Sequence, residues 1–261
     1  MSSYHQQILT VLERIEREEN VQILYACESG SRAGGFPSKD SDYDVRFIYI
    51  RPVDWYLSIF EKRDVIERPI SDMLDINGWD LRKALNLFRK SNPPLLEWLQ
   101  SPIVYRENHT IADQIRRISP LTFSPRSCIY HYLHMAKGNY RDYLQGEQVE
   151  IKKYFYVLRP ILACEWIEKH NTMPPIEFDR LVDYVVPKGS DKAVILDLLA
   201  RKKAGDEMDY EPRINPINDY LEEKIAYYER TAPGLRPGDG NQDQRLDGLF
   251  RSALKEVWGK R

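Results

Sequence analysis

The chain has 261 residues, of which 42% are hydrophobic and 30% are charged, and its formal net charge is −2. This length suits two compact domains, and the composition excludes a disordered chain. The near-neutral charge excludes a polycation that coats nucleic acid without selectivity. The longest apolar runs, such as Ile161 to Cys164, are too short to span a bilayer, and the N-terminal segment MSSYHQQILTVLERIEREEN lacks a secretory pattern. We therefore expect a cytoplasmic protein with no membrane partner.

Three cysteines, Cys27, Cys128 and Cys164, lie far apart in the chain and form no CxxC pair. An odd number of widely spaced cysteines argues against a disulfide framework and against a structural zinc site. We expect buried, reduced thiols and no disulfide partner.

The first part of the chain alternates between helix and strand patterns. Residues 6–18 have the apolar spacing of an amphipathic helix, and VQILYAC and YDVRFIYI are apolar runs typical of buried strands. A short helix is expected around Trp55 to Phe60. The segments DVIERPI and DMLDI are two further strand candidates, and the second belongs to a strand expected over residues 72–77. Asp80 is placed to cap a strongly periodic helix, and a second helix runs through Leu99.

Beyond about residue 119 the strand signals disappear. Helical patterns follow over residues 124–145, 150–170, 189–203 and 215–230, and the Gly- and Pro-rich segment TAPGLRPGDGNQDQ precedes a last amphipathic helix.

This organisation predicts an α/β (α+β) domain with a small mixed sheet over residues 1–119 and an all-helical domain over residues 120–230. A flexible connector and a C-terminal helix would occupy residues 231–261. The substrate cleft is expected between the first two parts.

The most informative segment begins where the first strand ends. Gly30 permits a tight turn and the close approach of a ligand to the backbone. A helix that starts at Ser31 offers unpaired N–H groups, and the Ser31 hydroxyl and the Arg32 guanidinium add donors suited to phosphate oxygens. The segment thus has the features of a phosphate-binding turn.

Carboxylates follow at the start of the next strand. Asp42 and Asp44 are two residues apart, so their side chains leave the same face. Asp75 is the best candidate for a third carboxylate of the site, because Leu74 and Ile76 on either side of it can face the core. Asp72 competes for that role, although no apolar residue precedes it.

Three carboxylates gathered within a few ångströms repel by roughly 3 kcal/mol per pair at an effective dielectric near 20. Without cations, one of them would take a proton. Mg²⁺ or Mn²⁺ makes the arrangement favourable, because hard ions prefer oxygen ligands and keep positions open for substrate phosphates. Two such ions about 4 Å apart suit phosphoryl-type transfer.

The segment GSRAGGFPSKDSDYDVRFIY resembles the nucleotidyltransferase signature of polymerase beta, kanamycin nucleotidyltransferase and the CCA-adding and poly(A) polymerases. With GWDLRKAL, KSNPPLLEWLQSPIVY and KKYFYVLRPILACEWI, it is most similar to the RNA-ligase-associated polymerase-beta-like proteins, over most of residues 20–170. The resemblance implies a nucleotidyltransferase domain in which Gly30 and Ser31 hold the triphosphate. It also implies that Asp42, Asp44 and Asp75 bind the metal ions and are the catalytic residues.

Relatives of this kind often close helices over the nucleotide. Lys137, Lys153, Tyr156 and Arg159 could supply a second wall of the cleft, and the alternative is solvated cations beside core aromatics. A metal pair at His131 and His134 is a weaker alternative, because no third ligand is near in sequence.

Two functions remain in competition. The first is an enzyme that moves a nucleoside monophosphate from ATP or another NTP to an acceptor hydroxyl, with release of pyrophosphate. The acceptor stays open between an RNA 3′ end, a small molecule and a protein side chain. The second is a non-catalytic nucleotide-binding or antitoxin-like module of the same fold, which has no need of three clustered carboxylates.

Overall fold

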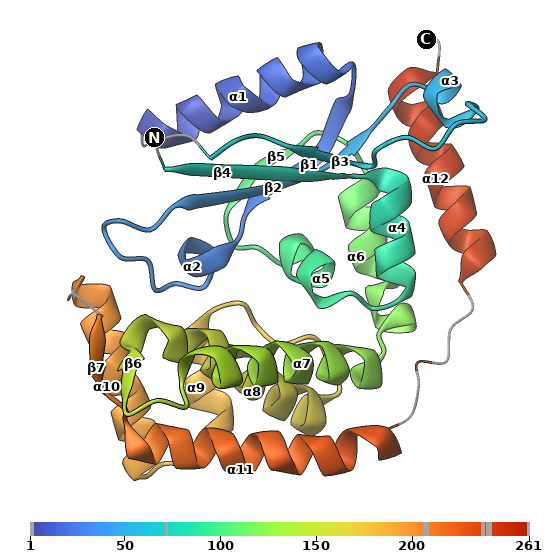
Figure 1. Ribbon diagram of the computed structural model, residues 1–261. Helices are drawn as coiled ribbons and strands as arrows, with labels where there is room; N and C mark the ends of the chain where they lie inside the picture. The colour runs from blue at the N-terminus through green and yellow to red at the C-terminus, as the bar shows by residue number, and fades with distance from the viewer. Residues whose placement is uncertain (1–2, 71–72, 206–208, 236–237, 239–241, 260–261) are drawn as a thin grey trace.

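The structure is a computed structural model that describes residues 3–70, 73–205, 209–235, 238 and 242–259. It has an α/β half, with a five-stranded sheet, and a helical half that lies below it in Figure 1. This arrangement confirms the predicted fold class, a small mixed sheet followed by a helical region.

The sheet has the strand order β3-β4-β2-β1-β5. Its strands are β1 (Gln22–Glu28), β2 (Tyr43–Ile50), β3 (Val65–Glu67), β4 (Leu74–Asp80) and β5 (Val104–Glu107). β2 and β4 are parallel, whereas the other neighbouring pairs are antiparallel. Because β1 and β2 lie inside the sheet, their long apolar runs are buried on both faces.

Helices cover both faces of this sheet. On one face lies α1 (Ser3–Glu19), whose buried Ile8, Leu12 and Ile15 share a core cluster with Val45 and Phe47 of β2. The other face carries α4 (Leu81–Arg89), α5 (Pro93–Leu99) and α6 (Ile111–Thr122), which meet the sheet in a second core cluster. The apolar face that the amphipathic periodicity gives each of these helices is therefore the face that packs against the sheet.

Several predicted boundaries are corrected in this half. The strand expected over residues 72–77 is β4, which begins at Leu74 and continues to Asp80, and the competing Asp72 lies outside the described residues. The short helix expected around Trp55 to Phe60 is α3 (Val53–Tyr56). β5 was not predicted, because its four residues are half-buried or exposed and carry little apolar signal.

As expected for the cap of α4, the Asp80 side chain accepts a hydrogen bond from the backbone N–H of Arg82 at 2.8 Å. The side chain is fully buried and also accepts from the Tyr56 hydroxyl at 2.7 Å. The far end of β4 is thereby joined firmly to the helix that follows it.

The helical half consists of α7 (Pro125–Tyr143), α8 (Tyr154–His170), α9 (Phe178–Val185), α10 (Ser190–Ala204) and α11 (Asn215–Thr231), with short 3-10 turns at Ile151–Lys153 and Ala232–Gly234. The expectation of helices alone was wrong in one detail. β6 (Gln148–Glu150) and β7 (Tyr210–Pro212) form an antiparallel pair. Strands of three residues are too short to produce a recognisable alternation in the sequence, so this pair was not predicted.

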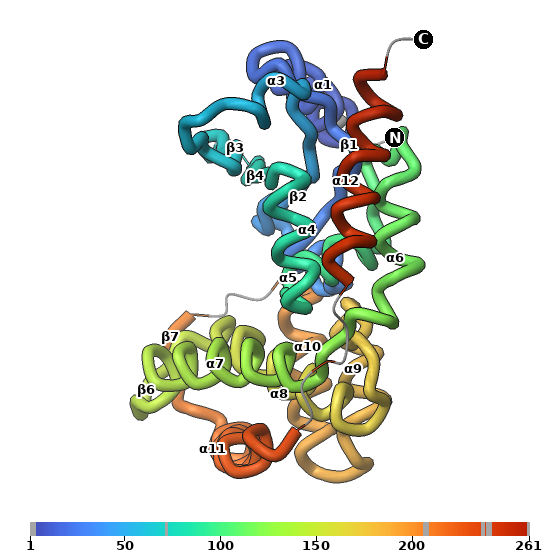
Figure 2. Tube along the Cα trace, turned by 90° about the vertical axis from the view of Figure 1, so that its right-hand side faces the viewer, coloured from blue at the N-terminus to red at the C-terminus, as the bar shows by residue number. Residues whose placement is uncertain are grey.

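The last helix, α12 (Asp243–Trp258), packs against α4 and α6 of the α/β half, as Figures 1 and 2 show. Its apolar residues Leu246, Leu249 and Ala253 belong to the same core cluster as those two helices. None of the helices in the described ranges is long and apolar enough to span a bilayer.

Candidate active site

A tight turn connects the end of β1 with the short helix α2 (Gly30–Ala33). Gly30 has φ +57°, a conformation that L side chains rarely adopt. A Cβ at this position would lie 2.0 Å from Oδ2 of Asp44. The turn therefore requires glycine at position 30 for two reasons: the backbone conformation is left-handed, and the Asp44 carboxylate occupies the space that a Cβ would need.

Asp44 and Asp75 lie side by side. The parallel register of β2 and β4 pairs these two residues directly. Between their side chains lies Arg46, whose Nη2 donates to Asp44 Oδ1 at 3.0 Å and to Asp75 Oδ2 at 2.7 Å. Its Nη1 donates to the carbonyl oxygen of Asp75 at 2.9 Å. A guanidinium thus partly neutralises the two carboxylates.

Burial is the main reason why the pKa of Asp44 is raised above its ordinary value. The charge of Arg46 opposes this shift, and the negative charges of Asp75 and Asp42 add to it. Burial and the neighbouring carboxylates therefore disfavour the charged form of Asp44, and a divalent cation beside it would favour that form.

Asp42 is exposed and lies just before β2. Its charge acts on Asp44, but no group of three metal-ligating side chains is assembled among the described residues. The structure thus brings Asp44 and Asp75 together and leaves Asp42 at the rim. Carboxylate oxygens are the donors that Mg²⁺ and Mn²⁺ prefer, so these residues fit such an ion chemically.

Arg32 is bound to the backbone that leads into β2. Its Nη2 donates to the carbonyl oxygen of Ser41 at 2.7 Å and its Nε to that of Asp42 at 3.1 Å. The guanidinium also lies 3.7 Å from the centre of the Tyr43 ring. These contacts indicate that Arg32 helps to position Asp42. This structural role is additional to the phosphate contact that the sequence predicts for Arg32.

Glu28 is a residue of the site that the sequence analysis missed. It is fully buried at the end of β1, where its Oε1 accepts from the backbone N–H of Asp44 at 2.7 Å and its Oε2 from the Tyr105 hydroxyl. Burial raises the pKa of this carboxyl group. An acidic residue that directly follows an apolar strand was the available signal, since a charge at such a position needs a partner.

The loop between α2 and β2 is anchored in the helical half. The Phe36 ring stacks on Phe155 at 5.2 Å and meets the edge of Phe178 at 5.5 Å. The backbone N–H of Phe178 also donates to the carbonyl oxygen of Gly34 at 3.0 Å. The helical half therefore fixes the segment that joins the glycine turn to the aspartates.

The four predicted residues of the helical half have partners of their own. Lys137 pairs with Glu229, and Arg159 pairs with Glu97 of α5 at 2.8 Å. Lys153 lies 3.7 Å from Glu150, and its ammonium group is close to the rings of Tyr143 and Tyr156.

Within the described ranges, none of the hydrogen bonds and ion pairs of these side chains reaches Asp44 or Asp75. Their contact with nucleotide stays a prediction. Nor do His131 and His134 join a metal-ligating group among the described residues.

A family model described as the RNA repair pathway DNA polymerase beta family matches residues 4–252. The protein belongs to this family. The match covers the glycine turn, the paired aspartates and the helical half together. This membership supports a nucleotidyltransferase function in general.

Among curated proteins, the chain is 53% identical over 253 residues to the uncharacterized protein YcgL of Bacillus subtilis (strain 168), and the match covers 97% of each chain. Among solved structures, it is similar to a nucleotidyltransferase-like protein from Exiguobacterium sibiricum 255-15. That similarity has 11% identity and a TM-score of 0.33, and it covers 98% of this chain and 88% of the other. So remote a similarity carries no argument about function.

Proposed function

We propose that the protein is a metal-dependent nucleotidyltransferase that moves a nucleoside monophosphate from an NTP, with ATP the expected donor, to an acceptor hydroxyl. The observation that carries this proposal is the pair of carboxylates, Asp44 and Asp75, held side by side at the start of two parallel strands. The pair adjoins a glycine turn whose backbone can approach a triphosphate closely.

Each part of the site has a task in this proposal. Gly30 and Ser31 hold the triphosphate, and Asp42, Asp44 and Asp75 hold Mg²⁺ or Mn²⁺, which neutralises phosphate charge. Arg46 keeps Asp44 and Asp75 together before substrate enters, because its guanidinium reduces their repulsion. The acceptor oxygen bonds to the α-phosphorus as the bond from that phosphorus to pyrophosphate breaks, and the proton of the acceptor hydroxyl passes to solvent.

An RNA 3′ end is the acceptor that we favour over a small molecule or a protein side chain. The description of the family names RNA repair, and a net charge of −2 does not prevent a contact limited to one basic surface.

The direct test incubates the protein with labelled ATP, Mg²⁺ or Mn²⁺, and either cellular RNA or a metabolite extract. We expect label in the RNA fraction and release of pyrophosphate. Label in small molecules would support the transfer reaction and change the acceptor. A protein that labels no pool and releases no pyrophosphate would contradict the proposed function.

One observation favours the alternative of a non-catalytic nucleotide-binding or antitoxin-like module. Arg46 already pairs with Asp44 and Asp75, so a positively charged side chain of the protein partly neutralises both carboxylates without a metal ion. A module that only binds nucleotide could keep this arrangement without turnover.

The proposed metal site predicts a thermal shift. Mg²⁺ or Mn²⁺ with NTP, at about 100 times the dissociation constant, should raise the melting temperature by roughly 5–10 °C, since a ligand specific for the native state stabilises it. Asp42→Asn should lose most of the metal-dependent part of this rise. Differential scanning calorimetry with and without EDTA measures it.

Asp40→Asn is the matched control, because it removes an exposed carboxylate two residues earlier. Equal metal-dependent shifts in the wild type and Asp42→Asn would contradict the site. The shift should also shrink as the pH falls. Protons compete with the metal ion for Asp44, and its raised pKa starts that competition at a higher pH than for an ordinary aspartate.

A further inference from the structure

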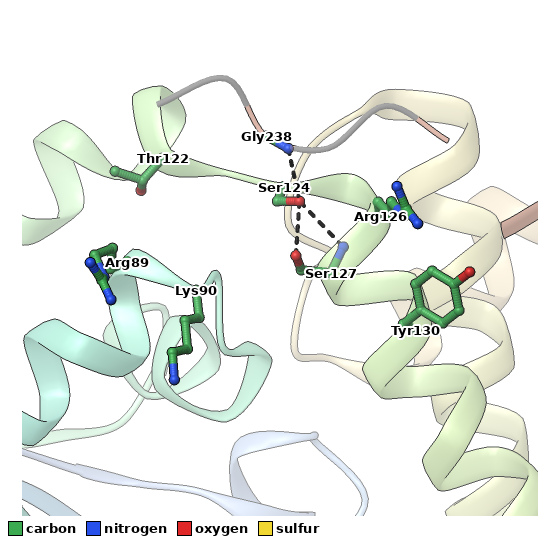
Figure 3. Close-up of a pocket in the computed structure, with 8 residues that line it drawn as sticks. All are labelled: Arg89, Lys90, Thr122, Ser124, Arg126, Ser127, Tyr130 and Gly238. Carbon is green, nitrogen blue, oxygen red and sulfur yellow. Dashed lines mark hydrogen bonds between the residues drawn. The ribbon is translucent and has the colours of Figure 1, made fainter. Parts of the chain in front are cut away.

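A pocket of about 490 Å³ lies where the α/β half meets the helical half (Figure 3). Arg89 and Lys90, at the end of α4, form one wall. Ser124, Arg126 and Ser127, at the start of α7, form the opposite wall. None of the described residues that line it is acidic.

Buried Ser91 ties the two walls together. It follows Lys90 directly with φ +52°, and its hydroxyl donates to the carbonyl oxygen of Thr122 at 2.7 Å. The same hydroxyl accepts from the backbone N–H of Ser124 at 2.9 Å. The basic side chains on α4 therefore keep a defined position relative to the start of α7, which is the preorganisation that a binding site needs.

The charge in this pocket is not explained by the stability of the helices alone. Lys90 at the C-terminal end of α4 is favourable for that helix. Arg126, in contrast, lies in the first turn of α7, where it adds positive charge to the positive end of the helix dipole and no acidic residue offsets it.

Two of the cations also have no acidic partner among the described residues. Arg89 is paired with Asp243 at 3.2 Å, whereas neither Lys90 nor Arg126 forms an ion pair within the described part of the chain. The pocket thus concentrates positive charge beside the Ser124 hydroxyl, whose oxygen accepts from Ser127 and Gly238 and whose proton can be donated to a ligand. These groups suit an anion with several oxygen acceptors.

The pocket is separate from the candidate active site. Asp75 lies near the start of β4, whereas α4 leaves the opposite end of this strand at Asp80, as Figure 1 shows. The strand between these two aspartates alone spans roughly 17 Å, and Lys90 lies beyond the last turn of α4. A nucleotide held at the glycine turn does not fill this pocket.

We propose that the pocket binds a phosphate group separate from those of the nucleotide substrate. A backbone phosphate of single-stranded RNA and a free phosphate anion share the chemistry that Lys90, Arg126 and the Ser124 hydroxyl recognise. We expect RNA to be the source of this phosphate group, and that expectation rests on the proposed function. The preference for a phosphate group rests on the pocket alone.

The test uses the double variant Lys90→Gln/Arg126→Gln. Both side chains are outside the core, and Arg89 is kept because it forms an ion pair with Asp243. The control, Arg141→Gln/Arg251→Gln, removes the same number of charges from exposed positions elsewhere. Binding of a short fluorescent single-stranded RNA is measured by anisotropy in EDTA without nucleotide, so the result does not depend on transfer activity.

We expect the double variant to bind RNA about tenfold more weakly than the wild type. The slope of log affinity against log salt concentration should decrease in magnitude by roughly 1. The control should bind like the wild type. Inorganic phosphate is the second probe, with its effect on the melting temperature as the measurement.

A phosphate effect that the double variant loses, with RNA binding unchanged, would identify a free anion as the source. Equal responses of the wild type and the double variant to both probes would overturn the proposal. Such a result would leave the proposed transfer reaction untouched, just as a failure of transfer would leave a positive binding result standing.

Discussion

Asp75→Asn should bind the Mg²⁺–nucleotide complex within about tenfold of the wild type and yet lose transfer by at least about 10²-fold. We expect Ser31, Arg32 and an ion held by Asp42 and Asp44 to retain most contacts with the nucleotide in this variant. In the proposed function, the Asp75 carboxylate would instead help to hold the metal ion beside the acceptor, where that ion would lower the pKa of the attacking hydroxyl. Its loss should therefore affect chiefly the transition state. Nucleotide affinity and the rate of pyrophosphate release are measured on both proteins.

A matched control is Asp64→Asn. This residue pairs with Lys83, and its carbonyl oxygen accepts from the N–H of Asp80 at the opposite end of β4, so it tests loss of a carboxylate beside the same strand. It should release pyrophosphate at the wild-type rate. If the wild type binds nucleotide but releases no pyrophosphate with any acceptor pool, and Asp75→Asn behaves identically, the non-catalytic module is the correct interpretation.

Gly30→Ala should reduce transfer by at least about 10²-fold, because a displacement of a reacting group by about 1 Å can have an effect of this size. The new methyl group would have to displace Asp44, whose Oδ2 lies 2.0 Å from its position. The positive φ adds roughly 1–2 kcal/mol of backbone strain. Transfer rates and urea unfolding curves measure the two effects separately.

Gly35→Ala separates strain from displacement. Gly35 has φ +77°, but a Cβ there would meet no atom within 4 Å. This variant should lose only the stability that backbone strain costs, roughly 1–2 kcal/mol, and keep its transfer activity. Equal losses of transfer in the two variants would show that strain in the loop, rather than the position of Asp44, causes the effect.

Much of the α/β half was predictable because its signals are local. The alternation of Asp44 with buried Val45, and the apolar neighbours Leu74 and Ile76 of Asp75, identify strands with one acidic face. Helix caps such as Asp80 are equally local, since the capping side chain and the N–H that it accepts from are two residues apart.

The partners of the helical-half cations were not predictable in this way. Arg159 meets Glu97, and Lys137 meets Glu229, across long stretches of sequence. Any carboxylate of the chain was an equal candidate before folding. The same holds for Phe36, whose aromatic partners lie in the helical half.

The sequence by itself determined the fold class, the glycine turn and the acidic residues, because side-chain alternation and turn conformation depend on neighbours along the chain. Only the tertiary structure decided that Asp44 and Asp75 share a register, that Arg46 joins them and that Asp42 stays at the rim. Strand register and ion pairing depend on which segments meet in space, and a shift of one residue would have turned Asp75 to the opposite face of the sheet.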